Sequence, residues 1–116
     1  MTKSDDADAV TRTILDYFEG WFDGDTARME RALHPELAKR RAGEELGILS
    51  KPRMLELTGQ LAGVEDRDDG RIEVEVHDVY KDAATATVHT VTYHEYVHLV
   101  RTAEGWRIAN ALWQPS

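Results

Sequence analysis

Cysteine is absent from this sequence of 116 residues, and with it several classes of protein are excluded. A chain without cysteine has no disulfide scaffold, no thiolate zinc site and no cysteine nucleophile. Serine occurs only at positions 4, 50 and 116, so catalysis by a serine nucleophile is not expected either. The sequence also has no glycine-rich phosphate loop, no Gly-x-Ser-x-Gly elbow and no dinucleotide-binding fingerprint.

Positive charge is scarce, because 14 Lys+Arg stand against 22 Asp+Glu and give a formal net charge of -8. A nucleic-acid-binding protein needs a basic stripe to displace counterions from phosphates, so we expect no nucleic-acid partner. The longest uncharged run, residues 83–94, is far shorter than the roughly 20 apolar residues of a membrane span. The N-terminus has no apolar signal core, so we predict a cytoplasmic protein that does not bind a membrane.

The sequence does contain enough apolar material for one core. Its hydrophobic content is 41%, which is typical of a globular protein rather than a disordered chain. A chain of this length buries roughly two-thirds of its unfolded surface, so it needs no metal or disulfide to fold. We therefore predict a single domain over residues 1–116.

The first half of the chain has the period of amphipathic helices. One apolar stripe is formed by Val10, Ile14, Tyr17, Phe18, Trp21 and Phe22. Gly24 ends this helix, and Asp25 is placed to cap a second helix over about residues 26–33. That helix stops before Pro35 because proline disfavours the helical conformation of the preceding residue. Ser50 then caps a third helix.

The second half alternates with a period of two, which is typical of strands with one wet and one dry face. Strands are predicted over residues 72–77, 84–89 and 106–113, and one more strand follows a reversal near residue 92. The first half also contains a short basic strand over residues 36–42. In the segment after the reversal, Val97 and Leu99 are expected on the dry face. In the final strand we expect Trp106, Ile108 and Leu112 to close the sheet against the first helix.

Three helices combined with a run of antiparallel strands predict an α+β domain. Because most of the sheet is one long meander, it can bury its apolar face only by curling around the helices. The predicted architecture is a half-open cone with a cavity at its open end.

Several short segments, taken in order, resemble a known superfamily. They are Tyr17–Gly20, Gly24–Asp25, Leu33–Arg40, His94–Arg101 and Gly105–Asn110, and they span nearly the whole chain. The ordered set is similar to the nuclear transport factor 2-like superfamily, which includes the SnoaL-like polyketide cyclases and the ketosteroid isomerases. Within it the chain most resembles the family called putative lumazine-binding. The resemblance implies a cone-shaped α+β fold in which three N-terminal helices pack on a curved antiparallel sheet, and this superfold hosts enzymes as well as binding proteins.

Two residues are candidates for catalytic acid/base chemistry. In the families that the chain resembles, the position of His34 tends to look into the cone, and an imidazole titrates near neutral pH. Glu95 lies on the dry face of its strand, where a carboxylate must be paired, neutralised or facing a cavity. The alternatives are a histidine that ties a helix end to a neighbouring strand, and an ion pair of Glu95 with Lys39 or Arg41.

The candidates for lining the pocket of the cone are Tyr17, Trp21, Lys39, Arg41 and Trp113. Lys39 and Arg41 lie on one face of the basic strand, where they would suit an anionic ligand. A charged, solvated edge strand explains the same two residues. The aromatic residues either line a pocket for a flat organic ligand or pack in the core.

The histidines of the second half, His77, His89, His94 and His98, raise the question of a metal site. Four residues of a strand span about 13 Å, so His94 and His98 are too far apart to share one ion. His77, His89 and His94 could meet across adjacent strands, but alternation places them on the outer face among polar residues. We predict no metal and no cofactor.

The outer face of the sheet is the expected contact of a homodimer. Tyr96, Val100 and Trp113 are predicted to share it with threonines and histidines. An exposed aromatic patch of that size is unusual on a monomer.

The sequence supports two functional hypotheses. The first is a small-molecule-binding protein or cofactor-free acid/base enzyme of the isomerase, dehydratase or cyclase type, acting on a small hydrophobic or aromatic metabolite. In it, His34 and Glu95 form the acid/base pair. The second is a non-catalytic ligand-binding or dimerisation module of the same fold. The two are separated by whether His34, Glu95 and Tyr17 converge on one cavity.

Overall fold

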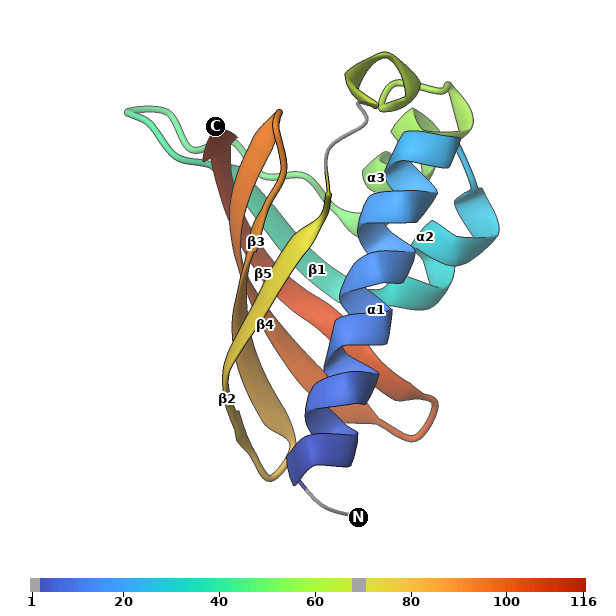
Figure 1. Cartoon of the computed structure of the whole chain (residues 1–116). Coiled ribbons are helices and arrows are strands. Elements are labelled where there is room, and N and C mark those ends of the chain that lie inside the picture. The colour runs from blue at the N-terminus through green and yellow to red at the C-terminus, as the bar shows by residue number, and fades with distance from the viewer. Residues whose placement is uncertain (1–2, 68–70) are drawn as a thin grey trace.

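The structure is a computed structural model that describes residues 3–67 and 71–116 (Figure 1). Its elements are α1 (Lys3–Asp23), α2 (Thr26–Ala32), β1 (Leu33–Arg41), α3 (Lys51–Gly59), the short 3-10 helix η1 (Val64–Asp66), β2 (Glu73–Tyr80), β3 (Ala83–His89), β4 (Tyr93–Thr102) and β5 (Gly105–Pro115). The helices and strands follow one another in the predicted order.

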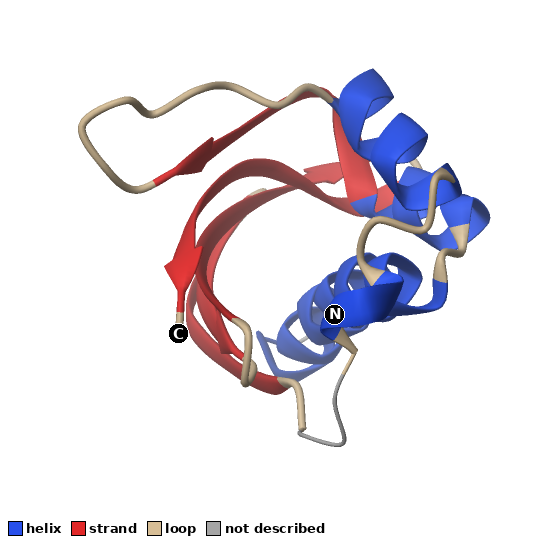
Figure 2. Cartoon of the chain, turned by 90° about the horizontal axis from the view of Figure 1, so that it is seen from above, coloured by secondary structure: helices blue, strands red, loops and turns tan. Residues whose placement is uncertain are grey.

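The strands form one sheet of five in the order β1-β5-β4-β3-β2. The meander from β2 to β5 is antiparallel, as predicted. β1 pairs with β5 in parallel, so the sheet as a whole is mixed. It curves around α1 without closing, as the view from above shows (Figure 2). The cone-shaped α+β fold is therefore confirmed, with a parallel edge strand beside the expected antiparallel meander.

The helix ends are set by the residues that the sequence indicates. The side chains of Asp25 and Ser50 each accept a hydrogen bond from the backbone N–H three residues further on, at the starts of α2 and α3. Gly24 links α1 to α2 at φ +69°, a left-handed conformation that glycine adopts without strain. α2 ends before Leu33, which is already extended. Among the helices that the structure describes, none combines the length and the apolar character needed to cross a membrane.

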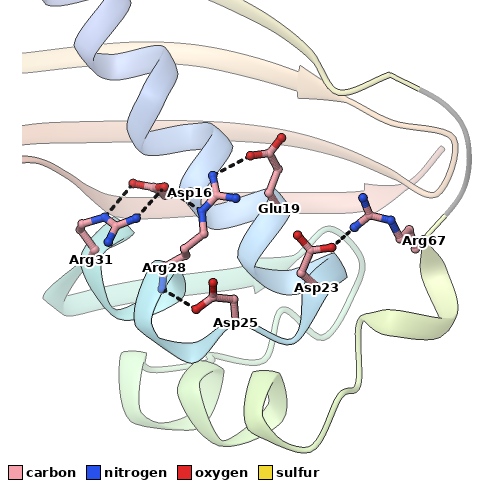
Figure 3. Close-up of polar contacts among 7 residues, drawn as sticks. All are labelled: Asp16, Glu19, Asp23, Asp25, Arg28, Arg31 and Arg67. Carbon is pink, nitrogen blue, oxygen red and sulfur yellow. Dashed lines mark hydrogen bonds and ion pairs between the residues drawn. The ribbon is translucent and has the colours of Figure 1, made fainter.

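Ion pairs tie α2 to α1 (Figure 3). Arg28 Nε lies 2.9 Å from Asp16 Oδ1, and its Nη2 lies 2.6 Å from Glu19 Oε1. Arg31 Nη2 lies 3.1 Å from the same Asp16 oxygen. Partial burial acts to raise the pKa of Asp16, but the hydrogen bonds from Arg31 and Arg28 outweigh it and lower that pKa. The cluster fixes the direction in which α2 leaves α1 and therefore where β1 begins.

The core lies between α1 and the concave face of the sheet. From α1 it takes five residues of the predicted stripe, Val10, Ile14, Tyr17, Phe18 and Phe22. From the meander it takes Val79, Ala84, Ala86, Val88, Val97, Leu99, Trp106, Ile108 and Ala111. Trp21, the remaining member of the stripe, is half-buried and packs against this core. The helical period therefore predicted the buried face of α1.

A β-bulge in β5 changes which residues of that strand face the core. Leu99 pairs with Ile108 but His98 pairs with Asn110, so Ala109 is an extra residue. Trp106 and Ile108 face inward before the bulge, as predicted, while Ala111 and Trp113 face inward after it. Two expectations from strict alternation were therefore wrong. Leu112 is 40% exposed instead of closing the sheet, and Trp113 is on the concave face and not in the outer patch.

Candidate functional site

A cavity of about 200 Å³ opens between the helices and the concave face of the sheet. It is formed by the C-terminal half of α1, the end of β1, α3, the start of β4 and the end of β5. Its lining residues are Tyr17, Phe18, Trp21, Lys39, Leu49, Met54, Leu57, Tyr93, Glu95 and Trp113. Most of this wall is apolar, with a few polar groups among the aromatic rings, which is the composition of small-molecule sites.

Three polar side chains on the cavity wall form one chain of hydrogen bonds. The Tyr17 hydroxyl donates to Glu95 Oε1 over 2.9 Å, and Lys39 Nζ donates to the Tyr17 hydroxyl. Lys39 Nζ also lies 3.9 Å from Glu95 Oε2, at the long end of an ion pair. All three side chains are buried. Helix α1 and strands β1 and β4 each supply one of them, so only the folded chain brings them together.

Local backbone geometry explains why Lys39 and Glu95 point inward. Leu37 and Lys39, two residues apart, both lie on the inner face of β1. Glu95 shares the inner face of β4 with Val97 and Leu99. A buried carboxylate needs a partner. The ion pair with Lys39, one of the alternatives that the sequence left open, is present in the structure.

Burial dominates the electrostatics of this chain of hydrogen bonds. It lowers the pKa of Lys39, against the opposing effect of the Glu95 charge. It raises the pKa of Glu95, although Lys39 and the hydrogen bond from Tyr17 act to lower it. Burial, followed by the Glu95 charge, also raises the pKa of Tyr17 well above its ordinary value. Each shift favours the neutral form of its group.

Aromatic rings surround the Lys39 amine. Its Nζ lies 5.0 Å from the centre of the Tyr17 ring, 5.8 Å from that of Trp21 and 5.7 Å from that of Trp113. Ring faces at these distances attract a cation. The polar contacts of the buried amine are with Tyr17 and Glu95.

Tyr93 and Asp66 form a second polar contact beside the cavity, which the sequence interpretation missed. Trp21 Nε1 donates to the Tyr93 hydroxyl over 3.2 Å, and that hydroxyl donates to Asp66 Oδ2. Burial and the hydrogen bond to Asp66 raise the pKa of Tyr93. Period-two alternation from Glu95 would have identified Tyr93. Asp66 is the last residue of η1, 27 residues before Tyr93, and no local pattern indicates it.

His34 lies away from this cavity, so the expected pairing of His34 with Glu95 is wrong in its geometry. Its Nδ1 accepts a hydrogen bond from the backbone N–H of Glu36. Its side chain borders a separate depression that also touches Lys51 and Arg107. The reason is that β1 begins at Leu33, which faces the core. The next residue of an extended chain must face the opposite way.

Of the five residues predicted to line the pocket, four line this cavity and one does not. Tyr17, Trp21, Lys39 and Trp113 are on its wall. Arg41 is exposed and is not among the lining residues. Its guanidinium lies 5.3 Å from the centre of the Trp113 ring, so it covers that ring from outside the cavity.

The histidines of the second half lie on the convex side, among polar residues. His89 Nδ1 is 3.0 Å from His94 Nδ1 across β3 and β4, and His77 Nε2 is 2.9 Å from Thr87 Oγ1. His98 contacts Asn110 over 3.4 Å. In residues 3–67 and 71–116, no three His, Cys, Asp or Glu side chains are grouped so that they could hold a metal ion.

Comparisons with known proteins agree with this architecture. The sequence matches the family described as "Putative lumazine-binding" over residues 5–114. A nuclear transport factor 2-like protein of unknown function from Silicibacter pomeroyi superposes with a TM-score of 0.84 at 19% identity, covering 100% of both chains. A protein described as a putative dehydratase of the same superfamily, from Streptomyces avermitilis, gives 0.71 at 15% identity and 99% of both chains.

A ketosteroid isomerase-like protein from Erwinia carotovora atroseptica gives a TM-score of 0.70 at 16% identity, covering 98% of both chains. At such identities these structures establish a shared fold and nothing about activity. A search of curated proteins finds no match.

Proposed function

This chain belongs to the family described as putative lumazine-binding, and from that premise we propose that its cavity binds a small hydrophobic or aromatic metabolite and moves protons on it without a cofactor. The observation that carries the proposal is the buried Lys39–Tyr17–Glu95 chain on the wall of an otherwise apolar cavity. Titratable groups with shifted pKa values in a concave site are typical of acid/base catalysis.

In this proposal Glu95 and Lys39 act directly on the ligand. The Glu95 carboxylate accepts a proton from a carbon next to a ligand carbonyl, and the Lys39 ammonium stabilises the negative charge that develops on the carbonyl oxygen. The carboxylic acid then returns the proton to another carbon, which is an isomerisation, or to a leaving hydroxyl, which is a dehydration. Tyr17 is a positioning residue that holds the carboxylate through Oε1.

The size of the cavity limits the ligand. An apolar cavity of about 150 Å³ in another protein holds benzene, and this cavity measures about 200 Å³. We therefore expect a ligand with one ring and a few substituents. Lumazine, named in the description of the family, has two fused rings and is the largest ligand that we expect the cavity to take.

A non-catalytic ligand-binding module is the second candidate function. Two observations favour it. Glu95 is already engaged by Tyr17 and Lys39, and His34 does not join Glu95 and Tyr17 on the cavity wall, which is the convergence that the sequence-based enzyme hypothesis required. A carboxylate held in this way contributes polarity and shape to a binding site without releasing or accepting a proton.

Two measurements on purified protein separate these functions. Titration with phenol, followed by the fluorescence of Trp21 and Trp113, reports binding of a one-ring ligand. Loss of the α-protons of acetophenone in D2O, followed by NMR, reports proton transfer. We expect phenol to bind and exchange to exceed that in buffer. Glu95→Gln should slow exchange by about 10²-fold or more, whereas Glu73→Gln, on an exposed carboxylate of β2, should match the wild type.

Each outcome selects one function. Binding of phenol without exchange above buffer would leave the ligand-binding module. Failure of phenol, acetophenone and lumazine to bind at millimolar concentration would overturn both candidates.

Homodimerisation and a cytoplasmic location stay predictions. The convex side still presents an apolar groove without Trp113, because Leu46, Tyr96 and Leu112 line it together with polar neighbours. We propose that a second copy of the chain covers this groove, and light scattering at micromolar protein tests it.

A further inference from the structure

We propose that Lys39 is a nucleophile that forms an imine with the carbonyl group of an aromatic aldehyde or ketone in the cavity. This inference rests on the proposed function, because it assigns a substrate class to the same site. It goes further in making the ligand covalently bound.

The geometry around Lys39 favours this chemistry over simple charge pairing. Its amine is enclosed by the rings of Tyr17, Trp21 and Trp113, which leave room on the cavity side for a flat ligand. A lysine that serves only to neutralise Glu95 would place its amine within hydrogen-bond distance of the carboxylate. Here the ion-pair distance is 3.9 Å, and the shorter contact of the amine is with the Tyr17 hydroxyl.

Tyr17 and Glu95 supply a path by which the ammonium loses its proton. The Tyr17 hydroxyl accepts from Lys39 and donates to Glu95, so two concerted proton shifts turn an ammonium and a carboxylate into an amine and a carboxylic acid. Burial promotes this shift, because it lowers the pKa of Lys39 and raises that of Glu95. A desolvated lysine in a hydrophobic pocket is a recognised form of activated nucleophile.

The reaction balances without any further reagent. The neutral amine forms a bond to the carbonyl carbon while the C=O π bond breaks, and a proton passes from nitrogen to oxygen to give a carbinolamine. The Glu95 carboxylic acid protonates the new hydroxyl, which leaves as water as the nitrogen lone pair forms the C=N bond. The products are a protonated imine, a carboxylate and one water molecule.

The carboxylate and the positive imine then occupy the places of the original ion pair. Charge in the cavity is therefore the same before and after the reaction, so no unpaired buried charge is created. The Tyr17, Trp21 and Trp113 rings that attract the ammonium attract the protonated imine as well.

Reductive trapping in the unaltered protein tests the inference. The protein is incubated with benzaldehyde and sodium cyanoborohydride, which reduces an imine to a stable benzylamine, and the labelled lysines are mapped by mass spectrometry. Early labelling of Lys39 should exceed that of Lys51 and Lys81 by about tenfold or more, since each unit by which an amine pKa falls raises its neutral fraction about tenfold.

Lys51 is the matched control. Its side chain is also largely buried, but it pairs with Glu30 and with the backbone oxygen of Leu33 outside the cavity. Lys51→Arg should leave labelling of Lys39 unchanged. Tyr17→Phe should slow that labelling while phenol still binds, because it interrupts the proton path and leaves the cavity open.

The outcomes distinguish this inference from the proposed function. Phenol binding with labelling no faster at Lys39 than at Lys51 and Lys81 would overturn the imine and leave the proposed function standing. Absence of both phenol binding and faster labelling at Lys39 would overturn the imine and the proposed function together. Fast labelling of Lys39 that excess phenol suppresses would support both.

Discussion

The two faces of the sheet differ in how deeply they bury polar, titratable side chains, and consecutive residues of β4 show the difference. Glu95 faces the cavity and is 1% exposed, whereas Tyr96, the next residue, faces outward and is 47% exposed. On the concave side, burial shifts the pKa values of Glu95, Lys39 and Tyr17 towards their neutral forms. On the convex side, His94 and His98 meet other polar side chains near water. Desolvation, more than residue type, distinguishes the concave face as the candidate functional site.

The largest expected effect comes from breaking the buried ion pair on the concave face. Lys39→Met leaves the Glu95 carboxylate without its cation and should lower the free energy of unfolding by about 3–5 kcal/mol. The double variant Lys39→Met/Glu95→Leu removes both charges and should be within about 1 kcal/mol of the wild type or more stable. Urea unfolding at pH 7 measures both. Equal losses in the single and double variants would contradict the ion pair.

The stability lost in Lys39→Met should depend on pH, and the direction of this dependence follows from the pKa of Glu95. The folded state raises the pKa of Glu95 above its ordinary value of 4.5. Above pH 4.5 the folded protein therefore keeps a proton on Glu95 that the unfolded chain releases, and the free energy of unfolding falls as the pH rises. Removing Lys39 removes an effect that lowers this pKa. The variant should therefore be close to wild type near pH 4 and fall further behind as the pH rises to 8. A deficit that shrinks over this range would refute this account.

Inserting one alanine after Asn110 should exchange the two faces at the end of β5. With the bulge kept, alternation then places Leu112 inward and Trp113 outward, which removes one wall of the cavity. We expect a loss of about 2–5 kcal/mol in the free energy of unfolding, in the range of core truncations, and loss of phenol binding. Acrylamide quenching of tryptophan fluorescence should increase. Unchanged quenching and binding would mean that the number of residues after the bulge does not determine which way Trp113 faces.

A hydroxyl on each face provides a smaller test. Tyr17→Phe removes an oxygen that is buried and bonded to both Glu95 and Lys39, which should cost about 1.5–3 kcal/mol. Tyr96→Phe removes an exposed hydroxyl and should change stability by less than about 0.5 kcal/mol. Thermal unfolding of both variants makes the comparison, and equal shifts would show that burial does not distinguish the two sites.

The smallest effect on folding is expected on the convex face. Leu112→Asp adds a charge to an exposed position and should leave the free energy of unfolding within about 0.5 kcal/mol. If a second copy covers the groove of Leu46, Tyr96 and Leu112, the same variant should shift the mass in light scattering from dimer to monomer. A dimer that survives this substitution must use another surface.

Features that depend on short stretches of chain were predictable from the sequence. Helical spacing predicted the buried face of α1, Asp25 and Ser50 predicted the starts of α2 and α3, and alternation predicted that Glu95 faces inward. The possible partnership of Glu95 with Lys39 also followed, because a buried carboxylate needs a cation and the basic strand offers one.

The rest depends on pairing between distant segments. The bulge at Ala109 arises from register with β4, and a single extra residue reverses the facing of Leu112 and Trp113. His34 faces away from the cavity because β1 starts at Leu33, three residues before the predicted start at residue 36. The parallel pairing of β1 with β5 leaves no trace in the periodicity of either strand.

The parallel pairing of β1 with β5 also has a consequence for how the chain folds during synthesis. β1 lies at the edge of the sheet, and among the strands that the structure describes it pairs with β5 alone. A ribosome releases β1 well before β5. Until β5 emerges, β1 can form its backbone hydrogen bonds with Leu46 and Leu49, but the edge of β1 that pairs with β5 and the side chain of Lys39 stay in water or on chaperones. The Tyr17–Glu95 bond, which joins residues 78 apart, must also wait for β4. The site is thus assembled late, and a nascent chain carries neither its cavity nor the buried Lys39 amine.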